Sequence, residues 1–368
     1  MRILHVIPDL QIGGAQSLVV NLIKNINPKI FDVRLCVLYP SFNTRLDYEL
    51  LKKEIPVYYL SKHKGIDLRM IGRLSRVLNN FRPDIIHTHM YIMRYTLIPM
   101  LLNRIPIRIH TLHTLAQHEV DFAGKIVQRV AFNFFNFMPI SVSNNVDISV
   151  KKVYNVSSII IYNGISVDYF DSLKKPCKRK KNETIFINVS GFRPVKNHHL
   201  LINALNMVVK VRQHIKLYLI GDGPLRPEIE KMVAVRNLQN NIIFLGIRDN
   251  IQELLKKSDV YVVSSKYEGQ SLSVMEAMLA GKPIISTGVE GMLDLVENEI
   301  TGILVPPNDT EALATAMIKL TDRIDLRKKM GKKGKERVVK RFNIKNTSES
   351  YENLYIDLYR QHYRVKCR

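Results

Sequence analysis

Tryptophan is absent from this chain of 368 residues, and cysteine occurs only three times. Cys36, Cys177 and Cys367 lie far apart, and they form no CxxC pair or other spacing typical of metal ligands. A small disulfide scaffold and a structural zinc site are therefore excluded, and a reducing compartment is expected.

Long apolar runs are also lacking. No stretch reaches the roughly 20 apolar residues that a membrane-spanning helix needs. The nearest candidate, residues 95–102, contains Pro99 and lies between Arg94 and Arg104. The N-terminal MRILHVIP is too short for a signal peptide. We therefore expect a cytoplasmic protein, either free or peripheral on the inner face of the cytoplasmic membrane.

Acidic residues are few: 33 Asp and Glu stand against 55 Lys and Arg, which gives a formal net charge of +22. This balance favours a polyanionic partner, namely a phosphorylated ligand, an anionic membrane or nucleic acid. A compositional drift towards lysine would explain the same excess without a partner. Nucleic acid is disfavoured, because no binding module is visible and the basic residues are scattered rather than interleaved with aromatics.

Short apolar strands alternate with helical patterns in both halves of the chain. This alternation predicts an α/β protein with two facing, Rossmann-like, doubly wound parallel sheets and a cleft between the two domains. We expect an N-terminal domain over residues 1–170, a basic linker over 171–183 and a second domain over 184–344. The aromatic helix pattern in residues 345–368 predicts a C-terminal helix that packs back on the first domain. The expected strands are residues 2–8, 33–39, 57–60, 85–89, 108–113, 139–142 and 159–162, then 184–189, 216–220, 242–245, 260–264, 283–286 and 302–305.

Ligands of such sheets bind beyond the carboxyl ends of the strands, so the loops there carry the candidate site. Gly13 and Gly14 lie in a loop expected over residues 9–16, where glycine lets a backbone approach an anion; a plain tight turn explains them equally well. In the second half, Gly191 opens a segment that places Arg193 and Lys196 after the first strand. Two cations there suit a diphosphate, although they are equally explained as surface charges.

The segment 264–281, SSKYEGQSLSVMEAMLAG, is the strongest signal. Glu268 lies in a loop, and Glu276 follows inside the next helix. The turn between them, Gly269, Gln270, Ser271 and Leu272, leads into the helix N-terminus, whose amides can hold a phosphate. A capping box between Ser273 and Glu276 is the structural alternative.

Three histidines, His87, His89 and His113, end adjacent strands of the first half. A single histidine at such a place is more often structural, but three together favour a polar site.

Taken together, these motifs resemble the large family of retaining nucleotide-sugar glycosyltransferases called family 4, which have the GT-B architecture. The resemblance runs nearly end to end. It rests on GGA at 13–15, PDIIHTH at 83–89, HTLH at 110–113, SVS at 141–143, YNGI at 162–165, GFRPVK at 191–196, IGDGP at 220–224, the segment 258–287 and TGILVPPND at 301–309. At Asp294 this chain has a shorter acid where many relatives have glutamate.

The resemblance implies a role for each candidate. Arg193 and Lys196 would bind the donor diphosphate, and Glu276 the ribose. Glu268 would contact the donor sugar. Further donor contacts would come from Gly14, Gly191 and the turn Gly269, Gln270, Ser271 and Leu272, and His113 would lie near the sugar's primary hydroxyl.

The implied reaction moves a sugar from a nucleotide sugar, with UDP as the expected nucleotide, to a saccharide acceptor. The resemblance further implies retention of anomeric configuration, and we expect a lipid-linked acceptor used in cell-surface polysaccharide synthesis. No Asp-x-Asp cluster suits a metal, so we expect neither metal nor cofactor. Acceptor sugars would stack on tyrosine or phenylalanine, with Tyr91, Tyr95 and Phe122 as candidates. A nucleotide-sugar epimerase, which needs no acceptor, is the alternative enzyme.

Overall fold

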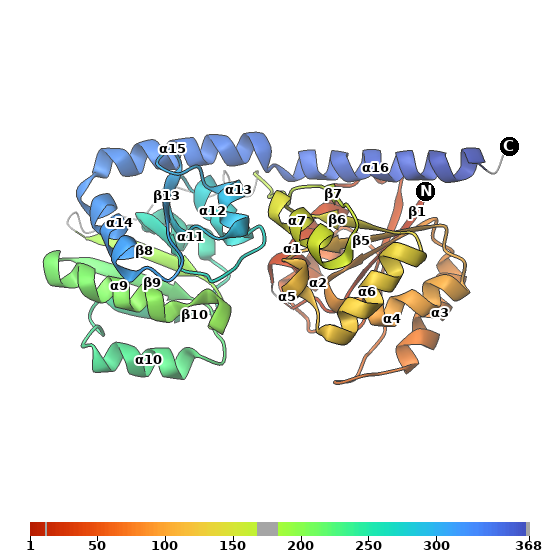
Figure 1. Cartoon of the computed structure of the whole chain (residues 1–368), viewed down its shortest axis with the longest axis horizontal. Coiled ribbons are helices and arrows are strands. Elements are labelled where there is room, and N and C mark those ends of the chain that lie inside the picture. Colours follow the sequence, from red (N-terminus) through yellow and green to blue (C-terminus); the bar gives the residue numbers. More distant parts are fainter. Residues whose placement is uncertain (12, 168–182, 366–368) are drawn as a thin grey trace. The chain divides into compact units, whose positions relative to one another are not determined.

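The computed structural model describes residues 1–11, 13–167 and 183–365, with side chains up to residue 363. The chain divides into two compact units (Figure 1). Unit 1 comprises Met1–Ile165 and Ile344–Arg368, and unit 2 comprises Ser166–Asn343. The linker expected over 171–183 lies outside the described residues, apart from Glu183.

Unit 1 is built on a seven-stranded sheet in the order β3-β2-β1-β4-β5-β6-β7, in which every pair of neighbours is parallel. The strands are β1 Arg2–Ile7, β2 Asp32–Val37, β3 Val57–Tyr59, β4 Ile85–His89, β5 Ile107–Leu112, β6 Phe137–Ser141 and β7 Ile159–Ile160. The helices are α1 Gly14–Asn25, α2 Arg45–Lys52, α3 Arg69–Phe81, α4 Met93–Leu102, α5 Ala116–Glu119, α6 Phe122–Phe134, α7 Asn144–Tyr154 and α16 Ile344–Val365, with a 3-10 turn at Met90–Ile92.

Unit 2 has a six-stranded parallel sheet in the order β10-β9-β8-β11-β12-β13. Its strands are β8 Thr184–Val189, β9 Ile215–Ile220, β10 Ile242–Gly246, β11 Val260–Val263, β12 Ile284–Thr287 and β13 Gly302–Val305. Its helices are α9 His198–Val211, α10 Arg226–Val235, α11 Ile251–Lys257, α12 Leu272–Leu279, α13 Glu290–Leu295, α14 Thr310–Asp322 and α15 Ile324–Arg341, with a 3-10 turn, η2, at Pro194–Lys196.

Both sheets confirm the predicted doubly wound α/β fold. Strand order reverses between β1 and β4 in unit 1, and between β8 and β11 in unit 2. At such a reversal the loops leave in opposite directions and open a crevice at the carboxyl edge, which is where ligands of this fold bind. The two reversals therefore locate the candidate sites.

Two local predictions are wrong. The first helix begins at Gly14, with Gly13 as its N-cap, so the expected loop over 9–16 is too long. The long helix α15 was not expected, because it is strongly basic and buries little more than Met330, Gly331, Gly334 and Val338. A Cβ on Gly331 would lie 1.9 Å from the carbonyl oxygen of Gly281, so α15 approaches the end of α12 through bare backbone.

The C-terminal helix α16 completes the core of unit 1. Tyr351 and Tyr355 are buried in one cluster with residues of the sheet, among them Ile3, Ile85 and Ile109. These aromatic rings cover one face of the sheet, and they explain why residues from the end of the chain belong to the first unit.

Candidate active site

A lysine–glutamate pair lies at the strand reversal of unit 2. Lys196 ends the 3-10 turn that follows β8, and Glu268 lies in the loop that follows β11. The Lys196 Nζ donates to both carboxylate oxygens of Glu268, at 2.8 and 2.6 Å. The two side chains are 24% and 14% exposed, so the pair is partly shielded from water but open to a ligand.

Backbone contacts hold the two loops of this pair together. The Lys266 amide donates to the carbonyl of Val195 at 2.8 Å, and the Ser264 hydroxyl donates to the carbonyl of Lys196 at 2.9 Å. Asn197 adopts the left-handed conformation, with φ of 50°, and so turns the chain from Lys196 into α9. The position of the cation is therefore set by main chain on both sides.

The loop that carries Glu268 is also pinned by α13. The Gly291 amide donates to the Glu268 carbonyl at 3.1 Å. A Cβ on Gly291 would lie 1.5 Å from the carbonyl oxygen of Gly269, so only glycine allows this approach.

Helix α12 directs its N-terminus to the same edge of the sheet. Its N-cap is Ser271, whose side chain makes no capping bond, and its first turn begins at Leu272. Ser273 is therefore inside the helix, and the capping box with Glu276 is wrong. Beneath the helix, the Tyr261 hydroxyl donates to the Val189 carbonyl at 3.1 Å. Burial raises the pKa of this phenol, and the Glu276 and Glu268 charges raise it further.

Gly191 and the GDGP turn form the neighbouring wall. The Phe192 amide donates to the Asp222 carbonyl at 3.0 Å, which joins the two loops. Gly221 has φ of +128°, and a Cβ there would lie 2.2 Å from the Ser190 carbonyl oxygen. Gly191 itself has room for a methyl group, because its nearest neighbour would be the Asp222 oxygen at 3.5 Å. Arg193 is exposed beside this wall.

Sequence reasoning missed His198, which begins α9 two residues after Lys196. Its ring stacks on Phe192 with the centroids 4.3 Å apart, and its Nε2 lies 3.2 Å from the Ser190 hydroxyl. Burial lowers the pKa of His198 to about 4, so the ring is neutral beneath the cationic loop. Its position in the sequence, next to the GFRPVK motif, is the signal that could have identified it.

In unit 1, the candidates lie at the carboxyl edge of the other sheet. Gly14 is the first residue of α1, and a Cβ there would meet no atom within 4 Å, so packing does not demand glycine. His113 directly follows β5, and its Nε2 lies 3.2 Å from Nδ1 of His89.

His87 and His89 are interior side chains. Both are fully buried, and both ring nitrogens of each have a hydrogen-bonding partner. His113 is partly exposed, but its Nδ1 is buried and has no hydrogen-bond partner among the described residues. Burial lowers the pKa of His113 to about 3, so the ring is neutral. Of the three expected histidines, only His113 therefore reaches the surface of the edge.

The three aromatic candidates for sugar stacking have different environments. Tyr95 is wrong as a stacking residue, because it is 6% exposed and its hydroxyl donates to the Gly65 carbonyl at 3.2 Å. Tyr91 is 38% exposed and Phe122 is 79% exposed, so both are open to solvent.

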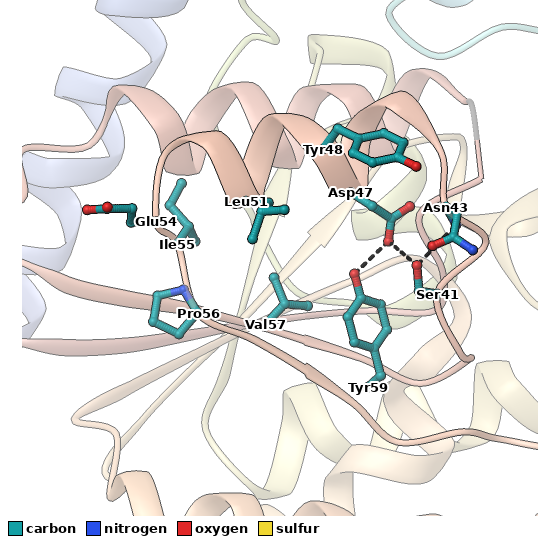
Figure 2. A pocket seen from close by; sticks show the side chains of 10 residues that line it. All are labelled: Ser41, Asn43, Asp47, Tyr48, Leu51, Glu54, Ile55, Pro56, Val57 and Tyr59. Atoms are coloured by element: carbon teal, nitrogen blue, oxygen red, sulfur yellow. Dashed lines mark hydrogen bonds between the residues drawn. The ribbon is translucent and has the colours of Figure 1, made fainter.

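A separate pocket of about 490 Å³ lies between α2 and the edge strand β3 (Figure 2). At one end of it, Asp47 accepts hydrogen bonds from the hydroxyls of Ser41 and Tyr59, at 2.7 and 2.5 Å. This carboxylate also forms the capping box of α2 with Thr44. No candidate residue lines the pocket; its lining is Ser41, Asn43, Asp47, Tyr48, Leu51, Glu54, Ile55, Pro56, Val57 and Tyr59.

Solved structures with the same arrangement of sheets define the class. The crystal structure of the Anabaena protein HepE in complex with UDP superposes with a TM-score of 0.81, covering 97% of this chain and 100% of that one at 18% identity. Two doubly wound parallel sheets with sites at their carboxyl edges are the GT-B fold.

Sequence comparisons then give the family. Residues 12–169 match the model described as Glycosyltransferase Family 4, and residues 170–337 match that described as Glycosyl transferases group 1. The chain belongs to the glycosyltransferases of GT-B fold.

Curated relatives span most of the chain. N-acetyl-alpha-D-glucosaminyl L-malate synthase of Bacillus anthracis is 28% identical over 319 residues, which is 82% of each protein. The UDP-Gal:alpha-D-GlcNAc-diphosphoundecaprenol alpha-1,3-galactosyltransferase of Escherichia coli is 26% identical over 312 residues, covering 79% of this chain and 80% of the relative.

Proposed function

We propose that this glycosyltransferase moves a sugar from a UDP-sugar to a lipid-linked saccharide acceptor, with retention of anomeric configuration, in cell-surface polysaccharide synthesis. The observation that carries the proposal is the placement of Lys196, Glu268 and the N-terminus of α12 at the strand reversal of unit 2. The cation and the helix amides at this edge suit a diphosphate. The carboxylates suit the hydroxyls of the sugar and the ribose.

In the proposed reaction, the bond between the anomeric carbon and the diphosphate breaks, and negative charge develops on the leaving nucleotide. Lys196, Arg193 and the first amides of α12 would stabilise this charge. Before the donor binds, Glu268 balances the charge of Lys196 and holds the ammonium at the mouth of the sheet. On donor binding, the diphosphate would take the place of Glu268 as partner of the lysine. Glu268 would then be free to accept from hydroxyls of the donor sugar.

These cations would perform the role that a metal ion has in other transferases, so the proposed reaction is metal-independent. Glu276 lies about one turn into α12 and would accept hydrogen bonds from the ribose diol. Unit 1 would bind the acceptor, with Gly14 approaching the diphosphate and His113 near a hydroxyl of the donor sugar.

Relatives support the choice of donor and acceptor. HepE binds UDP in its crystal structure, and the name of the E. coli relative states UDP-Gal as donor and alpha-D-GlcNAc-diphosphoundecaprenol as acceptor.

Apolar side chains on the surface of unit 1 support a membrane-bound acceptor. Helices α4 and α6 pack together (Figure 1). Both helices expose apolar side chains. On α6, Phe122 and Phe134 are 79% and 74% exposed, and on α4 Leu102 is 70% exposed. Basic side chains such as Arg129 lie on the same helices. These apolar groups do not serve the core, and an apolar face with basic residues suits an anionic lipid surface. No helix among the described residues is long and apolar enough to span a membrane.

A donor screen tests the proposal. Purified protein is incubated with each UDP- and GDP-sugar, with and without a polyprenyl-diphosphate saccharide, and with and without EDTA. We expect acceptor-dependent release of UDP that EDTA does not change, and a product that keeps the donor's anomeric configuration. Interconversion of nucleotide sugars without acceptor would identify an epimerase instead, and a strict need for Mg²⁺ or Mn²⁺ would overturn the role given to Lys196.

A further inference from the structure

A chain of hydrogen-bonded rings runs through the core of unit 1 and ends at His113. Nε2 of His113 lies 3.2 Å from Nδ1 of His89, and Nε2 of His89 lies 3.0 Å from Nδ1 of His5. Nε2 of His5 lies 3.5 Å from the hydroxyl of Tyr355 on α16. The same hydroxyl lies 2.7 Å from Nδ1 of His87. Helix α16 and strand β1, from opposite ends of the polypeptide, thus meet at the hydroxyl of Tyr355.

Each of the four imidazoles that this hydrogen-bonded series joins is neutral at physiological pH. Burial lowers the pKa of His5 and of His113 to about 3, and it holds the pKa values of His87 and His89 well below their usual range. A neutral imidazole has one N–H donor and one bare nitrogen acceptor. If one ring donates from a nitrogen, the facing nitrogen of its neighbour must be bare, and the neighbour then carries its proton on its other nitrogen.

Tyr355 sets the direction, because its hydroxyl has one proton for two nitrogens. The shorter distance of 2.7 Å, which is typical of a hydroxyl donor, assigns that proton to Nδ1 of His87. With that proton directed to His87, the Tyr355 oxygen can accept a weak bond from Nε2–H of His5, which leaves Nδ1 of His5 as an acceptor.

The remaining protons follow from His5. His89 donates from Nε2 to His5 and accepts at Nδ1, and His113 donates from Nε2 to His89. Nδ1 of His113 is left bare. This is also the cheaper arrangement for the protein alone, because a buried acceptor without a partner is tolerated better than a buried N–H.

We propose that Tyr355, His5 and His89 are positioning residues that fix His113 as the Nε2–H tautomer and thereby hold its ring in one orientation at the strand edge where the donor sugar is proposed to bind. The proposal rests on the proposed function, which places His113 beside the donor sugar. Its new element is the coupling of a tyrosine on the C-terminal helix to the proton state of a residue at the strand edge.

Metal binding is a competing reading of the same rings, because ligand atoms of His5, His87 and His89 lie within 4.8 Å of one another. Two features argue against it. His87 already uses both nitrogens, since its Nε2 lies 2.7 Å from the Thr111 hydroxyl. In addition, three neutral rings in a buried site offer no negative charge to balance a dication.

The test compares Tyr355→Phe with Tyr351→Phe. Both tyrosines are buried on α16, but the Tyr351 hydroxyl meets Thr111 at 3.2 Å, off the path from Tyr355 to His113. Long-range ¹H–¹⁵N spectra of histidine-labelled full-length protein report which ring nitrogen carries the proton, and His113→Gln assigns the signals of His113. We expect one Nε2–H tautomer of His113 in the wild type and in Tyr351→Phe, and a mixture of tautomers in Tyr355→Phe.

Kinetics separate this proposal from the proposed function. When His113 no longer prefers one tautomer, kcat/KM of Tyr355→Phe should fall about fivefold, equivalent to about 1 kcal/mol at 25 °C. Tyr351→Phe should stay near wild type. Unchanged His113 tautomers in Tyr355→Phe would overturn the coupling between Tyr355 and His113, as would ring ¹⁵N shifts of the wild type that show bound zinc. A tautomer mixture with full activity would support the coupling between Tyr355 and His113 but overturn the role of His113 in sugar transfer. If Tyr355→Phe does not fold, His5→Gln breaks the same path and is read in the same way.

Discussion

The pairing of Lys196 with Glu268 concerns two side chains that lie 72 positions apart in the sequence. Their loops leave neighbouring strands, β8 and β11, at the reversal of strand order. At 24% and 14% exposure, solvent screens the pair only in part, and ordering the long lysine side chain offsets part of the attraction. The pair is best understood as a charge held ready for a ligand, rather than as a source of stability.

Substitution of the two glutamates should separate binding from turnover. Glu276→Ala removes hydrogen bonds to the ribose, so the Kd for UDP should rise on the order of tenfold or more, as for the loss of a charged hydrogen bond. Glu268→Gln keeps the shape but removes the charge, so kcat should fall. UDP binding should not weaken, because the diphosphate no longer has to displace a carboxylate from Lys196. Calorimetric titration with UDP and steady-state kinetics measure the two effects. Glu311→Ala, an exposed glutamate on α14, is the control. If both variants match it in both assays, the site assignment is wrong.

At the scale of elements, the site depends on contacts that admit no side chain. Helix α13 meets the loop of Glu268 and Gly269 through Gly291, where a Cβ would lie 1.5 Å from a carbonyl oxygen. The loop between β9 and α10 similarly meets the loop after β8 through Gly221. The cation, the carboxylates and the helix amides are thereby held in register by backbone packing.

Gly291→Ala should push α13 away from the Glu268 loop. We expect a loss of about 1–3 kcal/mol in unfolding free energy, the usual cost of overpacking, together with a large loss of turnover. Gly72→Ala in α3 is the matched control, because a Cβ there meets nothing within 4 Å and alanine favours a helix. Urea unfolding and activity of both variants measure the difference. Equal effects of the two substitutions would contradict the argument.

Helices α4 and α6 are the elements expected to bind lipid. Wild-type protein should float with anionic vesicles at low salt and be released as salt screens the basic side chains. The double variant Phe122→Ser/Phe134→Ser should lose most of this binding. Val235→Ser/Ile247→Ser removes two apolar side chains of unit 2 that are 71% and 69% exposed, and it should float like the wild type. Wild-type protein that remains at the bottom of the gradient would rule out the membrane proposal.

For the molecule as a whole, buried histidines are distributed unequally. Unit 1 encloses His5, His87, His89 and His113, while in unit 2 only His198 among the described residues has a pKa clearly lowered by burial. A lowered pKa in the folded state means that below about pH 6.5 the unfolded chain binds more protons. Each such histidine then costs about 1.4 kcal/mol of stability per pH unit, until the pH falls to its folded pKa.

Acid should therefore weaken unit 1 before unit 2. The carboxylates with lowered pKa values lose their contribution only below about pH 4.5, so a comparison of about pH 7 with about pH 5 isolates the histidines. Hydrogen exchange with mass spectrometry, corrected for the intrinsic pH dependence, should show a greater loss of protection in peptides of the first sheet and α16 than in those of the second sheet. Equal losses in both units would contradict this reading.

Much of this protein is determined by local sequence. The alternation of short apolar strands with helical patterns is enough to predict parallel sheets, because a strand buried on both faces needs apolar residues throughout its length. The motifs follow strands, and parallel strands end at one edge, so the sequence alone predicts that Lys196, Glu268 and Glu276 lie at the same edge of the sheet. The helix α15 could not, because its few buried residues and two glycines give no periodic apolar face.

Tertiary structure alone decided the contacts between distant segments. The bidentate approach of Lys196 to Glu268, the backbone contact of Gly291 and the enclosure of His5 depend on strand order and on how closely loops pack, neither of which is encoded in a local pattern. Tyr355 meets His87 across 268 positions of sequence because α16 covers the first sheet. Residue type and periodicity fix what each segment can do, whereas close packing over long sequence separations fixes which side chains act together.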